Sequence, residues 1–234
     1  DRSWGVVAII GASTANSTIL SVDISGGGVS HIESIKFLGM LSIHDSSNLL
    51  LERLELFGNR AGDDALHLVY VKDAVIQDIR IHKVLADAID IDIGENIVFD
   101  TIQIENAGND CLDLMTSTVI VKRSLFQGCG DKALSVGERS TLLIAESNIE
   151  DSTSGVVAKD ESLAMMVDVK FSNNSENVTE ARKNPAYRYK GRVAIAESGA
   201  STWRWFEDYL ESAFQNEMID SMFRADSTES HVQG

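Results

Sequence analysis

Apolar and polar residues alternate in short stretches that return at a nearly constant distance along the chain. Four pentapeptides share the order polar, small, aliphatic, mostly polar, aliphatic, and they start 22 or 23 residues apart: DALHL from Asp64, DAIDI from Asp87, DCLDL from Asp110 and KALSV from Lys132. A second alternating stretch begins about ten residues after each start, and Gly, Asn, Asp and Ser lie between the stretches. This pattern is typical of short half-buried β-strands joined by tight turns, with no room for a helix.

The repeat continues in both directions, with GMLSI from Gly39 and SWGVVAI from Ser3 upstream, and GVVAKDES from Gly155 and GRVAIAE from Gly191 downstream. A period near 22 made of strands predicts an all-β protein, a right-handed parallel β-helix of about seven coils over residues 1–200. Equivalent residues of successive coils then form ladders. One inward ladder is Leu66, Ile89, Leu112, Leu134 and Val156, and the next is Leu68, Ile91, Leu114, Val136 and Ala158.

The periodicity changes near the C-terminus. Residues 201–223 place apolar side chains at steps of three and four, which predicts an amphipathic helix with an acidic opposite face. We expect this helix to cap the last coil, because an uncovered end of a β-helix is an open sheet edge. The alternative is that it contacts a partner or a second copy of the chain. Residues 224–234 form a polar tail.

Composition narrows the classes of partner. The 234 residues are 44% apolar, enough for a substantial core, and the net charge of −16 at pH 7 argues against nucleic acid or an anionic membrane as the main partner. No apolar run is long enough to span a bilayer. The two cysteines, Cys111 and Cys129, are 18 residues apart, which does not match the repeat, so we expect two free thiols rather than a disulfide.

At this point the chain resembles a known group. GMLSIHDS, GDDALHL, ADAIDIDIG, GNDCLDL, GCGDKALSVGERS and GVVAKDES follow the order seen in bacterial right-handed β-helix repeat proteins of the pectate-lyase-like superfold. The resemblance covers roughly residues 4–185. It implies the fold and a secreted or cell-surface location, since the group occurs in surface or secreted proteins, sometimes beside spore-coat kinase-like domains. It says little about function, because the superfold hosts many activities.

Two polar ladders follow from the register, one of Asp64, Asp87, Asp110 and Lys132, and one three residues later of His67, Asp90, Asp113 and Ser135. Aspartates that precede a strand bind backbone N–H groups, which explains the first ladder. The second ladder points outward in mid-strand, where carboxylates about 4.8 Å apart repel unless a cation lies between them. Calcium tolerates such sites, so we predict one at Asp87, Asp90, Asp110 and Asp113, against the alternative of a solvated acidic face.

Two functions remain open. The first is an extracytoplasmic binding or structural module without chemistry of its own, whose partner is a polysaccharide or a cell-surface protein. The second is a polysaccharide lyase or epimerase acting at the aspartate-rich face, with His67 or Lys132 as base and Asp90 and Asp113 beside a calcium ion. The aspartate coils carry no outward arginine, so an anionic sugar would meet an anionic wall. A glycosidase built on Asp90, Asp92 and Asp113 is conceivable, but the expected hydrolase motifs are absent.

Overall fold

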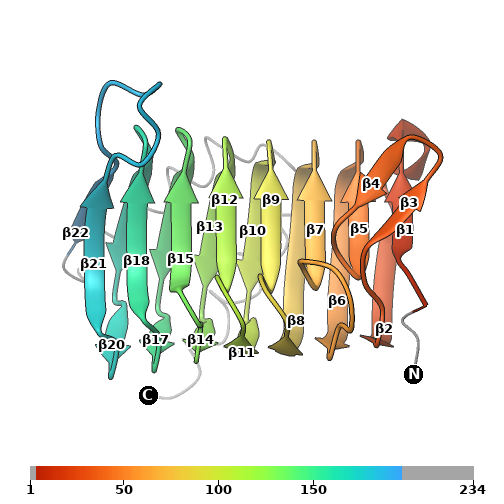
Figure 1. Cartoon of the computed structure of the whole chain (residues 1–234), viewed down its shortest axis with the longest axis horizontal. Coiled ribbons are helices and arrows are strands. Elements are labelled where there is room, and N and C mark those ends of the chain that lie inside the picture. The colour runs from red at the N-terminus through yellow and green to blue at the C-terminus, as the bar shows by residue number, and fades with distance from the viewer. Residues whose placement is uncertain (1–3, 197–234) are drawn as a thin grey trace, which may run out of the picture. The chain divides into compact units, whose positions relative to one another are not determined.

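The computed structural model describes residues 4–196, which wind into a solenoid of parallel strands (Figure 1). One strand of each coil belongs to an eight-stranded sheet, here called sheet A. Its strands, in spatial order, are β1 (Val7–Ile10), β5 (Leu41–His44), β7 (Leu66–Val69), β9 (Ile89–Asp92), β12 (Leu112–Met115), β15 (Lys132–Gly137), β18 (Ser154–Lys159) and β21 (Glu176–Ala181). This confirms the predicted all-β parallel β-helix, and the number of coils is close to the seven expected.

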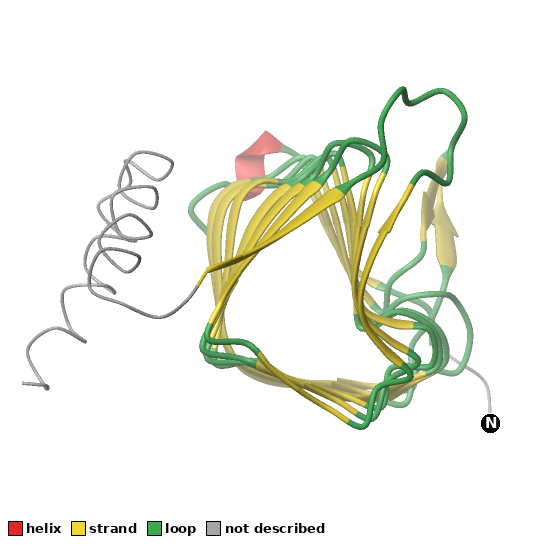
Figure 2. Ribbon diagram, turned by 90° about the vertical axis from the view of Figure 1, so that its left-hand side faces the viewer, coloured by secondary structure: helices red, strands yellow, loops and turns green. Residues whose placement is uncertain are grey.

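The other walls of each coil come from a twelve-stranded sheet, sheet B. The long strands β6 (Ser47–Phe57) and β8 (Lys72–Val84) turn a corner, so the first part of β8 pairs with β10 and its last part pairs with β11. The corner gives the coil an angular cross-section (Figure 2). The remaining strands are β2 (Thr18–Ser25), β10 (Glu95–Asp100), β11 (Gln103–Ala107), β13 (Thr118–Lys122), β14 (Leu125–Gln127), β16 (Thr141–Ala145), β17 (Asn148–Glu150), β19 (Leu163–Val167), β20 (Lys170–Ser172) and β22 (Arg192–Ala196).

The core lies inside the coils and is made of the predicted inward ladders. Leu112 pairs in register with Ile89 on one side and Leu134 on the other, and all three side chains are buried. Leu114 stands in the same relation to Ile91 and Val136. Stacking identical classes of residue every 22 or 23 positions therefore buries a continuous apolar column, as the sequence pattern predicts.

The turns between walls adopt the same backbone conformation in coil after coil. After sheet A, the same position of the turn has a positive φ, between 48 and 56°, in six coils: Asp45, Tyr70, Ile93, Thr116, Glu138 and Asp160. In the last two of these turns the next residue, Arg139 or Glu161, has a positive φ as well. Buried serines complete the hydrogen bonding of these turns. Ser117 Oγ accepts the N–H of Gly94 at 2.8 Å, and Ser140 Oγ accepts the N–H of Ser117 at 3.0 Å. The buried turn amides are thus paired with the next coil.

An antiparallel hairpin, β3 (Ser30–Ile32) and β4 (Ile35–Phe37), interrupts the solenoid and lies over the N-terminal strands of sheet A (Figure 1). A short 3-10 helix follows β1 at Ala12–Thr14. Within the part of the chain that is described, no helix has the length and apolar character of a membrane span. The predicted helix over residues 201–223, with its capping role, and the tail that follows lie outside the described residues.

Candidate functional site

Polar side chains converge on the outer face of sheet A where β7 meets β9. The register places His67 beside Asp90, and Val69 beside Asp92. His67 Nε2 lies 3.5 Å from Asp90 Oδ2 and 3.3 Å from Asp92 Oδ2. Asp64, three residues before His67, completes the group, because one ligand atom each from Asp64, His67 and Asp90 lie within 4.8 Å of one another. We call Asp64, His67 and Asp90 the β7–β9 cluster.

Side chains predicted to point outward are largely covered here. His67 is only 3% exposed and Asp64 only 1%. Phe37 at the end of the β3–β4 hairpin is fully buried and packs on His44 with ring centroids 4.8 Å apart, and His44 meets the edge of the His67 ring at 5.5 Å. Gly39 is needed for this cover, because a Cβ at that position would lie 2.8 Å from the backbone nitrogen of His67.

Burial leaves several polar atoms without partners. Among residues 4–196, no hydrogen bond reaches Asp64 Oδ2, His67 Nδ1 or His44 Nε2. Orphaned buried polar atoms are rare in folded proteins and call for a specific explanation. Asp90 and Asp92, by contrast, keep 20% and 28% of their side chains exposed, so the cluster opens to solvent on their side.

Burial and mutual repulsion dominate the electrostatics of the cluster. Desolvation, followed by the charge of Asp90, raises the pKa of Asp64 to about 9. Desolvation, followed by the charges of Asp92 and Asp113, raises the pKa of Asp90 to about 8. Burial and the neighbouring His67 lower the pKa of His44. At neutral pH the two carboxyl groups therefore favour the protonated form unless a positive charge replaces the protons.

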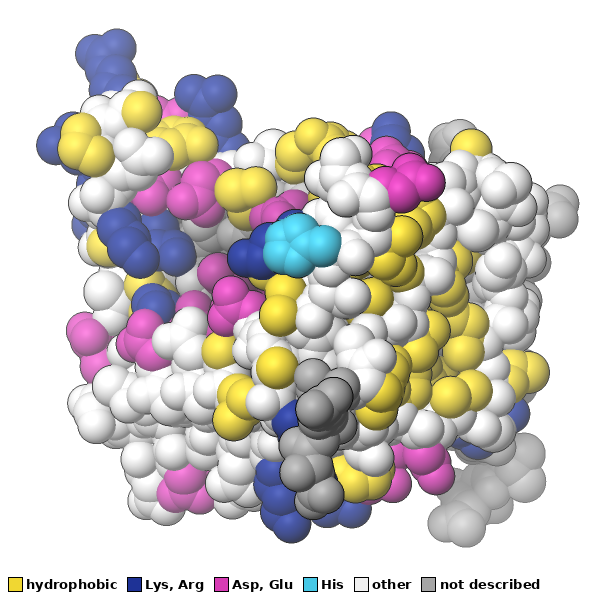
Figure 3. Space-filling view, turned by 45° about the vertical axis from the view of Figure 1, so that its right-hand side comes forward, with side chains coloured by type: hydrophobic (Ala, Val, Ile, Leu, Met, Phe, Trp, Pro, Cys, Tyr) yellow, Lys and Arg dark blue, Asp and Glu magenta, His cyan; other side chains and the backbone are white. Residues whose placement is uncertain are grey.

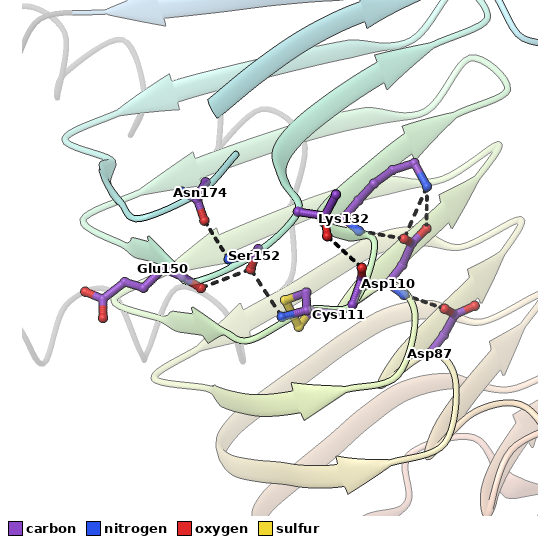
Figure 4. The surroundings of a disulfide bond; sticks show 10 residues. Asp87, Asp110, Cys111, Lys132, Glu150, Ser152 and Asn174 are labelled. Carbon is purple, nitrogen blue, oxygen red and sulfur yellow. Dashed lines mark hydrogen bonds and ion pairs between the residues drawn. A yellow bond between two sulfur atoms is a disulfide. The ribbon is translucent and has the colours of Figure 1, made fainter. Parts of the chain in front are cut away.

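The rest of the first polar ladder behaves as turn chemistry predicts. Asp87 Oδ1 accepts the side-chain amide of Asn109 and the backbone N–H of Asp110, both at 2.7 Å. Asp110 Oδ1 accepts the backbone N–H of Lys132 at 2.9 Å, and Lys132 Nζ pairs with the same carboxylate (Figure 4). Lys132 Nζ also pairs with Asp131. Asp87 and Asp110 bind the next coil rather than their own. The calcium site over Asp87, Asp90, Asp110 and Asp113 stays a prediction, but Asp87 and Asp110 already accept backbone N–H groups.

The other candidate residues are spread along sheet A. Asp113 lies in register between Asp90 and Ser135, and Lys159 Nζ approaches its Oδ1 to 3.9 Å. A Cβ at Gly137 would lie 3.1 Å from the side chain of Lys159, so the glycine leaves room for this reach. Lys132 belongs to the Asp110 pair rather than to the His67 group. The contact between Lys159 and Asp113 was not predicted from the sequence.

The prediction of two free thiols is wrong. Cys111 and Cys129 form a disulfide, with Cα atoms 5.4 Å apart (Figure 4). Cys111 begins one coil, and 18 residues complete most of the circuit, so Cys129 lies at the end of the same coil, near the corner where that coil began. The prediction required the two cysteines to be one repeat apart and so to lie one above the other. That requirement was wrong, because the first and last residues of a single coil also meet where the coil closes. Both side chains are buried, and the backbone N–H of Cys129 donates to Ser152 Oγ at 3.2 Å.

A cationic segment, residues 182–192, is made of the loop between β21 and β22 and the first residue of β22, and its loop projects from the C-terminal end of sheet A (Figure 1). We call it the basic loop, since it contains five cations and two tyrosines: Arg182, Lys183, Tyr187, Arg188, Tyr189, Lys190 and Arg192. Basic side chains gather on this projection in the space-filling view (Figure 3). This segment, RKNPAYRYKGR, was not predicted as a site, because it lies outside the regular repeat on which the prediction of the aspartate ladders rested.

Carboxylates of neighbouring turns fix the basic loop. Asp160 Oδ1 accepts the backbone N–H groups of Lys183 and Asn184 at 2.8 and 3.0 Å, and Glu161 Oε1 accepts that of Arg188 at 2.8 Å. Below the loop is a hollow of about 520 Å³, lined by Glu161, Ser162, Tyr189, Lys190 and Arg192. Hydrogen bonds from Arg139 and from backbone groups of the loop lower the pKa of Glu161.

Two solved structures are among those similar to this chain. Among solved structures, the tailspike protein 2 enzymatically active domain of bacteriophage CBA120 aligns with a TM-score of 0.47 and 11% identity over 85% of this chain, which spans 38% of that domain. Pectate lyase Pel9A aligns with a TM-score of 0.44 and 9% identity, over 86% of this chain and 67% of the lyase. Identities this low carry no information about a site or its chemistry.

No curated protein matches the sequence significantly. The family described as "Right handed beta helix region", however, matches residues 39–198, which is more than half of the chain. The solenoid, its parallel register and this match lead to one assignment: the chain belongs to the right-handed β-helix family.

Proposed function

We propose that this chain is an extracytoplasmic β-helix module that binds an acidic polysaccharide at the C-terminal end of sheet A. The observation that carries the proposal is the basic loop. Five cations within eleven residues stand out on a chain whose net charge is −16. A concentrated positive patch on an acidic protein selects an anionic ligand and steers it to one place on the surface.

The side chains of the basic loop suit a sugar chain that carries carboxylates. Lys190 pairs with Glu180, whereas Arg182, Lys183 and Arg192 form no ion pair with any of residues 4–196. Guanidinium groups bind carboxylates through two parallel hydrogen bonds. Tyr189 is 60% exposed and its ring lies 5.1 Å from the Arg188 guanidinium. A flat ring of this kind offers a surface for the C–H face of a pyranose.

The loop is also held in place before a ligand arrives. Its backbone is fixed by Asp160 and Glu161, which lie on the turn between β18 and β19. A binding surface that is already ordered loses less conformational entropy on association, so weak individual contacts add up to a useful affinity. The acidic cluster at β7–β9 belongs to earlier coils, so an anionic chain can occupy the basic end without crossing it.

The disulfide supports an extracytoplasmic location. Cys111 and Cys129 are bonded and buried inside a solenoid, with no free cysteine in the chain. Structural disulfides form and persist in oxidising compartments and are rare in the cytosol of mesophiles. A secreted or surface-exposed module would meet polysaccharides there.

The alternative function is a lyase or epimerase, and it needs an available base beside a cation. Lys132 is held by Asp110 and Asp131, and their hydrogen bonds raise its pKa against the effect of burial, which makes it a poor base. His67 is 3% exposed. Neither candidate base is presented to a ligand, so the geometry favours binding over chemistry.

Isothermal titration calorimetry with an oligogalacturonate tests the proposal, and a neutral gluco-oligosaccharide serves as the comparison ligand. We expect the acidic sugar alone to bind, with an affinity that falls as salt increases. Tyr189→Ala and Arg192→Ala should each weaken binding by about tenfold, as the loss of one stacking or charge-assisted contact implies.

Tyr70→Ala is the matched control, because Tyr70 is 52% exposed but lies on the turn after β7, away from the basic loop. Its affinity should equal that of the parent chain. Equal binding of neutral and acidic sugars, or an undiminished affinity in both loop variants, would contradict the proposal. The appearance of unsaturated sugar ends during the titration would support the enzyme instead.

A further inference from the structure

We propose that the β7–β9 cluster, Asp64, His67 and Asp90, is a binding site for a divalent first-row transition-metal ion, for which zinc is the probe. The site is independent of the basic loop and of its glycan, because it lies on other coils and shares no residue with the loop. It also differs from the calcium site expected on the aspartate ladder in two of its three residues.

The distances between the ligand atoms fit such an ion. Zinc holds nitrogen and oxygen ligands at about 2.0–2.2 Å, so two ligands of one tetrahedral ion lie roughly 3.4 Å apart. His67 Nε2 is 3.5 Å from Asp90 Oδ2. The ligand atoms of all three residues lie within 4.8 Å of one another, so small side-chain rotations suffice to close the set.

An independent observation points to a missing ligand. Asp64 is 1% exposed, and its Oδ2 has no hydrogen-bond partner among residues 4–196. An isolated buried carboxylate oxygen is strongly destabilising unless a proton, a donor or a cation satisfies it. The equivalent residues in the next two coils, Asp87 and Asp110, both have backbone partners. Asp64 therefore departs from the role of Asp87 and Asp110, and of these three coils only that of Asp64 carries a histidine.

The donor set selects the class of ion. Calcium is bound by six to eight oxygen ligands, whereas the β7–β9 cluster offers one imidazole nitrogen and two carboxylates. Imidazole favours zinc and its first-row neighbours. Asp92 Oδ2, 3.3 Å from His67 Nε2, lies where a fourth ligand could come from. Because Asp90 and Asp92 are partly exposed, an ion can enter from solvent.

The surroundings hold the histidine in place. The edge of its ring meets His44, which in turn packs on Phe37, and the chain at Gly39 passes close over its backbone. Sites with fixed ligands bind metal more tightly than sites whose side chains must be ordered first. The hairpin that covers His67 would thus supply the packing that a metal site needs.

The test is a calorimetric titration of the chelator-treated protein with zinc chloride, repeated with cobalt and calcium. We expect one zinc ion per chain and visible cobalt absorption bands typical of mixed nitrogen and oxygen ligands. Asp64→Asn and Asp90→Asn should each weaken zinc binding by about a hundredfold or more, since even outer-shell changes cost 10–100-fold. Zinc should raise the melting temperature of the parent chain but not of these variants.

Asp113→Asn is the control, because it removes a carboxylate from the same ladder one coil further along. Zinc binding should be unchanged in it. Asp90→Asn keeps the test decisive if Asp64→Asn fails to fold, since Asp90 is partly exposed. The proposal is overturned if no first-row ion binds, if zinc binds equally to the Asp64 and Asp90 variants, or if calcium alone binds and is lost in Asp113→Asn.

Discussion

Asp64 begins a strand, where aspartate commonly accepts backbone N–H groups, yet one of its oxygens has no partner among residues 4–196. Asp87 and Asp110, the equivalent residues of the next two coils, each accept a backbone N–H group. Burial raises the pKa of Asp64 to about 9, whereas the same group in an unfolded chain has an ordinary value near 4. This difference makes the stability of the metal-free protein depend on pH.

The sign of that dependence follows from which state binds the proton. Between about pH 4 and pH 9 the folded chain keeps a proton on Asp64 and the unfolded chain has lost it. The free energy of unfolding should therefore fall as pH rises through this window, by at most about 1.4 kcal/mol per pH unit from this one group. Below pH 4 both states are protonated and the effect ends.

We predict that Asp64→Asn flattens the decline in stability between pH 5 and pH 8. Urea unfolding at several pH values, with chelator present, measures it. Asp113→Asn should change the slope much less than Asp64→Asn, because it only removes one of the charges that raise the pKa of Asp90. Some slope should remain in Asp64→Asn, because burial also raises the pKa of Asp90 to about 8. Parallel curves for Asp64→Asn and the parent would show that Asp64 is charged in the folded state.

The repeating unit is a strand followed by a turn whose first residue is left-handed, and the identity of that residue varies. Asp, Glu and Tyr occupy it in several coils, but Ile93 and Thr116 are β-branched. The left-handed conformation costs L-residues about 1–2 kcal/mol, and a β-branched side chain in it is unusual. The stacked neighbours impose the conformation, since the N–H of Ile93 donates to the carbonyl of Met115 at 2.9 Å.

Ile93→Asn should therefore stabilise the solenoid by about 1 kcal/mol, because asparagine adopts the left-handed conformation more readily. The Ile93 side chain is 38% exposed, so the lost apolar contact offsets only part of the gain. Leu85→Asn is the control. Leu85 is 58% exposed and does not have a positive φ, so its replacement relieves no strain. If urea midpoints show no greater gain for Ile93→Asn than for Leu85→Asn, the turn stores no strain at this position.

For the molecule as a whole, the stacked strands that repeat in every coil were predictable from the sequence. The hairpin and the basic loop, which interrupt the repeat, were not. Period and alternation alone predicted the ladders of Leu66 and Leu68, because each coil must bury the same positions against the next. The β3–β4 hairpin breaks the period, so the burial of His67 beneath it could not be read from spacing. For the same reason Asp64 was interpreted as a turn residue, and the basic loop was missed as an insertion within the last coil.

The disulfide is another feature that crosses the period. It links Cys111 to Cys129 within one coil near the middle of the described solenoid, between the coils of the β7–β9 cluster and those of the basic loop. In a solenoid each coil contacts only its neighbours. If a coil in the middle loses stability, the coils on its two sides can therefore unfold independently of each other. A cross-link that closes a loop of this length contributes about 3 kcal/mol in the chain-entropy model.

We predict that reduction lowers the urea midpoint and broadens the transition, as the two ends of the solenoid begin to unfold separately. Circular dichroism measures the loss of strand structure in the whole solenoid. Zinc binding reports the folding of the coils around β7 and β9, and glycan binding reports the folding of the coils at the basic loop, if the two proposed sites exist. Cys111→Ala with Cys129→Ala is the control, because a reductant should not shift it further. Both sulfurs are buried, so the reductant must act in mild urea, where coils open transiently. A single sharp transition at the parent midpoint in the reduced chain would mean that the stacked ladders alone couple the coils, and that the disulfide adds nothing to their cooperation.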